Sequence, residues 1–118
     1  MAHITFGEKL REYRRAAGLS QRVLARLVGV DFSYISKVEN GRLPPPAADT
    51  IVKICGVIKT DPEELLALTG KLPSEVRETV GTKRVAQEFL REVQRMDLTD
   101  AEWETMIKEL GNLRDDTQ

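Results

Sequence analysis

The sequence has little of what enzymes use to attack substrates or hold metals. Among its 118 residues there is one cysteine, Cys55, and one histidine, His3. One cysteine cannot form an internal disulfide, and the place of Cys55 on an apolar helical face predicts a small core side chain. His3 lies in a short tail before the first helix and is expected to be solvated. No metal-ligand spacing, phosphate-binding glycine loop or nucleophile with a neighbouring base is visible, so we expect neither an enzyme nor a bound metal or cofactor.

Long apolar runs are missing as well. No stretch approaches the ~20 apolar residues of a membrane span, and no charged and then apolar leader follows Met1. Hydrophobic residues make up 41% of the chain and charged residues 31%, which are ordinary values for a globular protein. We therefore expect a cytoplasmic protein with one main core and no contact with a membrane.

Positive charge is not in excess over the whole chain, but it is unevenly distributed. The formal net charge is −1. Residues 1–60 hold ten Lys and Arg against five Asp and Glu, whereas residues 61–118 hold eight against fourteen. A basic half and an acidic half predict that the first half contacts nucleic acid.

The first half reads as a series of short helices. Thr5 and Ser20 are the expected N-caps of the first two helices, and Gly18 and Gly29 are expected to end these helices. A third short helix begins after Asp31, whose carboxylate is expected to cap it. Two short helices joined by a three- or four-residue turn that contains glycine form the helix-turn-helix pattern.

The third helix carries an exposed polar face. Its sequence, VDFSYISKVENGR, spans residues 30–42, and Asn40-Gly41 supplies a left-handed stop. Ile35 and Val38 are three residues apart, so they share one face and point into a core. The residues left facing outward are Phe32, Ser33, Tyr34, Ser36 and Lys37.

Residues 18–46, GLSQRVLARLVGVDFSYISKVENGRLPPP, closely resemble the helix-turn-helix of the Cro/C1 repressor family, also called the XRE family. The resemblance runs from Phe6 to about Gly70. It implies a five-helix lambda-repressor-like DNA-binding domain over residues 1–70. Together with a helical extension over residues 71–118, expected from pattern, this predicts an all-α fold. The resemblance also implies binding to double-stranded DNA, with the third helix in the major groove.

The family's functional positions carry over to matching residues of this chain. Base-reading candidates are Phe32, Ser33, Tyr34, Ser36 and Lys37. Phosphate-contact candidates are Gln21, Arg22, Asn40 and Arg42. Arg14 and Glu39 match an ion pair between the first and third helices of related repressors, which we interpret as structural. Phe32 departs from the polar residue often found there, so it either packs on a thymine methyl or supports a neighbouring side chain.

Residues 71–118 must be interpreted from pattern alone. Two or three amphipathic helices are expected there, one of them capped by Thr99, and their apolar faces need a partner. A second copy of the chain is one partner, with Phe89, Trp103 and Met106 as interface candidates, while packing onto the first domain is the alternative. The sequence thus predicts a dimeric repressor that binds an inverted-repeat operator. The competing hypothesis is an antitoxin-like or adaptor module whose C-terminal helices bind a partner protein, such as a metallopeptidase that cleaves repressors.

Overall fold

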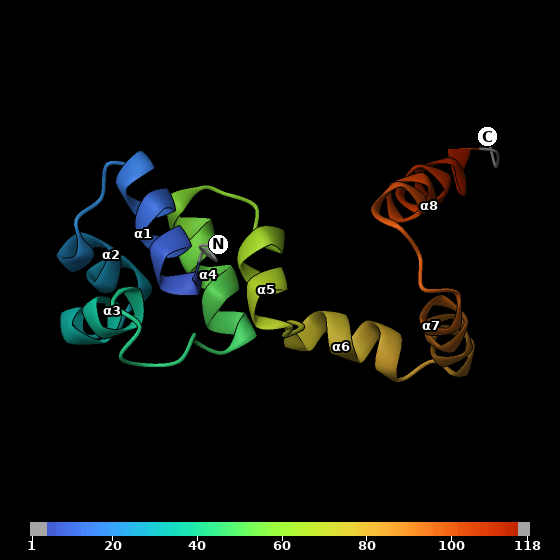
Figure 1. Cartoon of the computed structure of the whole chain (residues 1–118), viewed down its shortest axis with the longest axis horizontal. Helices are drawn as coiled ribbons and strands as arrows, with labels where there is room; N and C mark the ends of the chain where they lie inside the picture. The colour runs from blue at the N-terminus through green and yellow to red at the C-terminus, as the bar shows by residue number, and fades with distance from the viewer. Residues whose placement is uncertain (1–4, 116–118) are drawn as a thin grey trace. The chain divides into compact units, whose positions relative to one another are not determined.

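The computed structural model describes residues 5–115, and within this range it contains eight α-helices and no β-strand. The helices, labelled in Figure 1, are α1 (Phe6–Ala16), α2 (Gln21–Val28), α3 (Phe32–Glu39), α4 (Ala48–Ile58), α5 (Glu63–Thr69), α6 (Ser74–Gly81), α7 (Arg84–Met96) and α8 (Asp100–Asn112). The all-α class predicted from the sequence is confirmed. The chain divides into two compact units, Met1–Arg77 and Glu78–Gln118. The predicted tail containing His3 lies outside the described residues.

The core of the first unit is built from all five of its complete helices. The buried side chains that form this core cluster are Phe6, Leu10, Leu24, Ala25, Val28, Ile35, Val38, Ile51, Ile54, Cys55, Ile58 and Leu65. Cys55 is buried as predicted, and burial, with a smaller effect of nearby Glu63, raises the pKa of its thiol to about 11. The thiol therefore stays protonated at neutral pH and serves as a small packing group.

Local capping explains where the first helices begin. The Thr5 hydroxyl accepts a hydrogen bond from the Glu8 N–H at 3.2 Å, and the Ser20 hydroxyl accepts one from the Val23 N–H at 3.1 Å. The prediction that the Asp31 carboxylate caps α3 is wrong, because this side chain makes no capping hydrogen bond. A capping carboxylate at Asp31 would accept a hydrogen bond from the Tyr34 N–H. This N–H donates instead to the backbone carbonyl of Asp31 at 3.1 Å.

The segment after α5 remains attached to the first unit. The Lys71 ammonium donates to the carbonyls of Pro45 and Pro46 at 3.2 and 2.9 Å. The Ser74 N–H and hydroxyl donate to the two carboxylate oxygens of Asp49 at 2.9 and 2.6 Å. These bonds hold residues 71–74 against the loop before α4 and its first turn, which accounts for a unit that extends to Arg77.

Helices α7 and α8 have no core of their own. None of the residues in these two helices, all of which are described, is buried. Val85 and Phe89 of α7 and Trp103 and Ile107 of α8 are large apolar side chains that stand exposed. The predicted capping of α8 is confirmed, since the Thr99 hydroxyl accepts from the Glu102 N–H while the Glu102 carboxylate accepts from the Thr99 N–H. Both helices therefore have defined local structure and unpartnered apolar faces.

Candidate nucleic-acid interface

Helix α3 turns its two core residues inward and its polar residues outward. Ile35 and Val38 are buried in the core of the first unit. Phe32, Ser33 and Lys37 are exposed, whereas Tyr34 and Ser36 are half-buried. Burial raises the pKa of the Tyr34 phenol above its ordinary value. Of the five predicted base-reading residues, the structure thus leaves three exposed and two half-buried.

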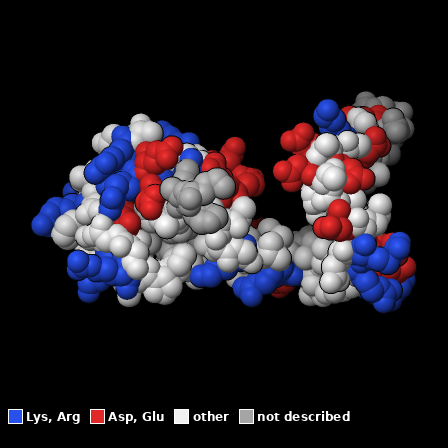
Figure 2. Space-filling view, viewed as in Figure 1, with Lys and Arg blue, Asp and Glu red and all other residues white. Residues whose placement is uncertain are grey.

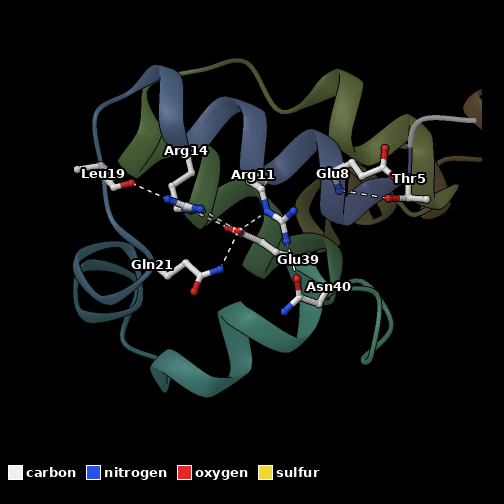
Figure 3. Close-up of polar contacts among 8 residues, drawn as sticks. All are labelled: Thr5, Glu8, Arg11, Arg14, Leu19, Gln21, Glu39 and Asn40. Atoms are coloured by element: carbon white, nitrogen blue, oxygen red, sulfur yellow. Dashed lines mark hydrogen bonds and ion pairs between the residues drawn. The ribbon is translucent and has the colours of Figure 1, made fainter.

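The C-terminal end of α3 is fixed by the buried carboxylate of Glu39, the last residue of the helix (Figure 3). The Arg14 guanidinium of α1 donates to both carboxylate oxygens, from Nε at 2.7 Å and from Nη2 at 2.9 Å. Gln21 of α2 donates its amide N–H to the same carboxylate at 2.9 Å. One carboxylate therefore joins three helices, and Arg14 and Glu39 meet in the ion pair that the family resemblance implied.

The charge state of Glu39 follows from these contacts. Burial disfavours the ionised carboxylate, but the hydrogen bonds from Arg14 and Gln21 and the positive charge of Arg14 outweigh it, so the pKa of Glu39 lies below its ordinary value. Arg14 also donates from Nη1 to the Leu19 carbonyl at 2.8 Å, in the turn before α2. At neutral pH the pair is ionised and holds the helix-turn-helix against α1.

Asn40 is oriented by the same group of residues. Arg11 donates from Nη2 to the Asn40 side-chain oxygen at 2.6 Å and from Nε to Glu39 at 3.4 Å (Figure 3). Because the acceptor of the Asn40 amide is directed at Arg11, its NH₂ group is left to donate elsewhere. Arg42 follows Gly41, which has a φ of +75°, and the Arg42 side chain is exposed.

A close approach of α1 to α3 depends on Gly7, which the sequence reasoning missed. A Cβ on Gly7 would lie 2.5 Å from the carbonyl oxygens of both Val38 and Glu39. Such distances are far inside van der Waals contact, so only glycine allows the two helices to meet at this depth. The signal in the sequence was a glycine in the first turn of a well-capped helix, where alanine would favour the helix more.

Basic side chains gather around α2 and α3. Figure 2 shows Lys and Arg concentrated at the end of the first unit that holds these helices in Figure 1. Arg15, Gln21, Arg22 and Phe32 line one hollow at the start of α2. The Arg22 guanidinium lies over the Phe32 ring, 4.3 Å from its centroid. The predicted phosphate-contact residues thus fall in two groups, Gln21 and Arg22 at the start of α2 and Asn40 and Arg42 after α3.

Groups that suggest other chemistry are missing from residues 5–115. No cluster of His, Cys, Asp or Glu there is suited to hold a metal ion, and no helix in this range is long and apolar enough to cross a membrane. Two short packed helices, α2 and α3, with a three-residue turn and an exposed second helix among basic residues, form a helix-turn-helix.

Comparison with known proteins gives the same class. Residues 5–68 match the family described as helix-turn-helix domain. The chain is 42% identical over 76 residues to RghRB of Bacillus subtilis, named as an uncharacterised HTH-type transcriptional regulator, over 62% of this chain and 55% of that relative. It is 30% identical over 111 residues to RghR of the same organism, named as an HTH-type transcriptional repressor, over 89% of this chain and 82% of RghR.

A solved structure agrees as well. The solution structure of the DNA-binding domain of the P22 C2 repressor is similar with a TM-score of 0.51 and 26% identity, over 56% of this chain and 86% of that one. The chain belongs to the Cro/C1-type helix-turn-helix family of DNA-binding transcriptional regulators, which confirms the resemblance seen in the sequence. Regulators of this family are DNA-binding proteins and not enzymes. The match to RghRB spans about half the length of that relative.

Proposed function

We propose that this regulator is a repressor that binds an inverted-repeat operator as a dimer, with α3 of each copy in a major groove. The observation that carries the proposal is the exposed face of α3, whose C-terminal end is held by Glu39 and whose start is flanked by basic residues. Ser33 and Lys37 offer hydrogen-bond donors and acceptors to base edges, and Tyr34 and Ser36 lie beside them. Repression takes place in the cytoplasm, by occupation of the operator.

Phosphate contacts on either side of α3 fix its register in the groove. Gln21 and Arg22 stand at the start of α2, where the first N–H groups of the helix have no partner within it. Asn40, with its NH₂ directed away from Arg11, and Arg42 stand after α3. These two groups of residues lie at opposite ends of α3. They are therefore suited to contact the two sugar–phosphate backbones that border a major groove.

This docking predicts different effects for substitutions of Lys37, which contacts a base, and Arg42, which contacts a phosphate. Lys37→Ala should cost about 1–3 kcal/mol of binding free energy and relax the base preference at one operator position. Arg42→Ala should weaken binding by a similar factor for all sequences. It should also reduce the slope of log K against log salt concentration by about one, as expected when one phosphate contact is lost. Both are measured by titration of operator and scrambled duplexes at several salt concentrations. An unchanged base preference in Lys37→Ala would contradict its role as a reader.

The C-terminal region, residues 71–118, is proposed to form the dimer. Phe89 and Trp103 are exposed and Met106 is half-buried, and apolar faces of this kind are usually covered by a partner. A two-fold dimer presents its two reading helices about 34 Å apart, one turn of B-DNA. Trp103→Ser should therefore shift the sedimentation of the full chain toward the monomer, while Leu27→Ser, at an exposed residue of α2, should leave it unchanged.

A partner protein on the same apolar faces is the second candidate. The same exposed side chains of α7 and α8 favour it, because they fit an amphipathic partner helix as well as a second copy. The two are separated by sedimentation of the purified chain over a range of concentrations. A reversible dimer supports the repressor, whereas a monomer at all concentrations supports a partner-binding module that uses DNA binding for autoregulation.

A further inference from the structure

The contact between Arg22 and Phe32 gives a role to the one base-reading candidate that cannot form hydrogen bonds. Phe32 is the first residue of α3 and is 38% exposed, and the Arg22 guanidinium carbon lies 4.3 Å from the centre of its ring. We propose that Phe32 is a positioning residue, which holds the Arg22 guanidinium for contact with a DNA phosphate and does not read a base. The inference rests on the proposed docking of α3.

The stack suits an arginine that must keep its donors for a ligand. The ring attracts the cation through the negative charge of its face, and the planar guanidinium can lie over that face with its N–H groups at the rim. Within the described residues 5–115, no hydrogen bond or ion pair from the Arg22 side chain to another residue is formed. Phe32 thus restrains the guanidinium without using any of the donors that would bind two phosphate oxygens.

The surroundings of the stack suit a phosphate. Arg15, Gln21 and Arg22 line the same hollow as Phe32. Arg11 and Arg14 also border it, and both pair with Glu39. Because Glu39 carries a single negative charge, the hollow keeps an excess of positive charge, and Arg15 and Arg22 are its two cations that make no ion pair with Glu39. A guanidinium held in this hollow meets the backbone of DNA when α3 lies in the groove, since phosphates border the groove on both sides.

Base reading fits Phe32 less well than its neighbours. Base pairs are distinguished in the major groove mainly by hydrogen-bond donors and acceptors, and a phenyl ring offers neither. An apolar side chain can still contact a thymine methyl group, but one face of this ring is covered by Arg22. Ser33 and Lys37, both exposed on the same helix, have the groups that such reading requires.

The test is a binding series with the full chain on two duplexes, the operator obtained by selection and a scrambled sequence, over a range of salt. The variants are Phe32→Leu, Arg22→Gln and the double substitution. Phe32→Leu should weaken binding to both duplexes by a similar factor, about two- to fivefold, as expected for an exposed cation–π contact. Arg22→Gln should lower the salt dependence by about one ion, and Phe32→Leu by part of that amount.

The double substitution decides whether the two side chains act together. With Gln at position 22 there is no guanidinium to hold, so Phe32→Leu should cause no further loss. Phe32→Tyr retains a ring beneath Arg22 and should recover the salt dependence that Phe32→Leu loses. Leu27→Ala, at an exposed apolar residue of α2, is the matched control for the removal of apolar surface and should leave binding unchanged.

Three outcomes would overturn the proposal. The first is a change of base preference at one operator position in Phe32→Leu with unchanged affinity for the scrambled duplex, which would make Phe32 a reader. The second is independent losses from Phe32→Leu and Arg22→Gln that multiply in the double variant. The third is a wild-type chain that prefers no sequence, which would overturn the proposed function together with this inference, whereas the first two leave the proposed function intact.

Discussion

Replacing Glu39 by Gln removes the charge on which the junction of α1, α2 and α3 depends while keeping the shape of the side chain. The Glu39 side chain has no solvent-exposed area, and the Arg14 side chain retains 8%. Glu39→Gln therefore leaves the Arg14 guanidinium buried without a counter-charge. Removal of one partner of a buried ion pair costs about 3–5 kcal/mol, a large share of the roughly 5–15 kcal/mol that stabilises an ordinary domain.

The loss is measured by urea unfolding, followed by far-ultraviolet circular dichroism. Glu12→Gln is the matched control, because Glu12 is an exposed acid on α1, the helix of Arg14, and its pairing with Lys9 lies at the surface. It should leave the unfolding midpoint nearly unchanged, since surface ion pairs contribute little. If Glu39→Gln lowers the free energy of unfolding no more than Glu12→Gln does, the buried ion pair of Glu39 does not stabilise the junction of α1, α2 and α3.

The pH dependence gives the same prediction an independent measure. Burial raises the pKa of Glu39, but the hydrogen bonds from Arg14, Gln21 and Arg11 lower it by a larger amount. The pKa in the folded state therefore lies below that of the unfolded chain. A group shifted in this direction stabilises the fold fully above its unfolded pKa, and the contribution disappears as the pH falls through the folded pKa. The difference between wild type and Glu39→Gln should therefore be constant near neutral pH and shrink in acid.

Two further predictions concern backbone geometry and are measured by thermal unfolding. Gly7→Ala should cost about 1–3 kcal/mol, because its Cβ would lie 2.5 Å from two carbonyl oxygens of α3 and would push the helices apart. Gly56→Ala, at an exposed helical glycine with nothing within 4 Å of the added Cβ, is its control and should stabilise by about 0.5–1 kcal/mol; a loss there or no loss at Gly7 would contradict the packing argument. Lys59→Gly should raise stability by up to about 1 kcal/mol, since Lys59 has a φ of +58°, a conformation that glycine adopts without the cost of a Cβ; a lowered melting temperature would show that the helix stop is not strained.

Local signals in the sequence predicted the helices well. Thr5, Ser20 and Thr99 each precede an amphipathic run, and each caps a helix in the structure. These caps depend on residues within one turn, so spacing along the chain is enough to find them. Asp31 failed as a capping side chain although it has the right residue type, because the first-turn N–H at Tyr34 found a main-chain acceptor.

Contacts between helices were harder to obtain from the sequence. The meeting of Arg14 and Glu39 was implied by resemblance to related repressors, and no spacing rule links two residues so far apart in the chain. Gly7 was missed because its role depends on how closely α3 approaches α1. From the sequence, Phe32 was expected either to pack on a thymine methyl or to support a neighbouring side chain. Arg22 was not named as that neighbour, since the stack joins side chains of different helices across a turn.

The most direct test of the account is selection of binding sites from random duplex DNA by the full chain, with sedimentation of the same preparation in parallel. A selected inverted repeat with half-sites about one helical turn apart, together with a dimer in solution, is the predicted result. A single enriched half-site bound by a monomer, or no enriched sequence, would contradict the dimeric repressor and leave α7 and α8 as a surface for another protein.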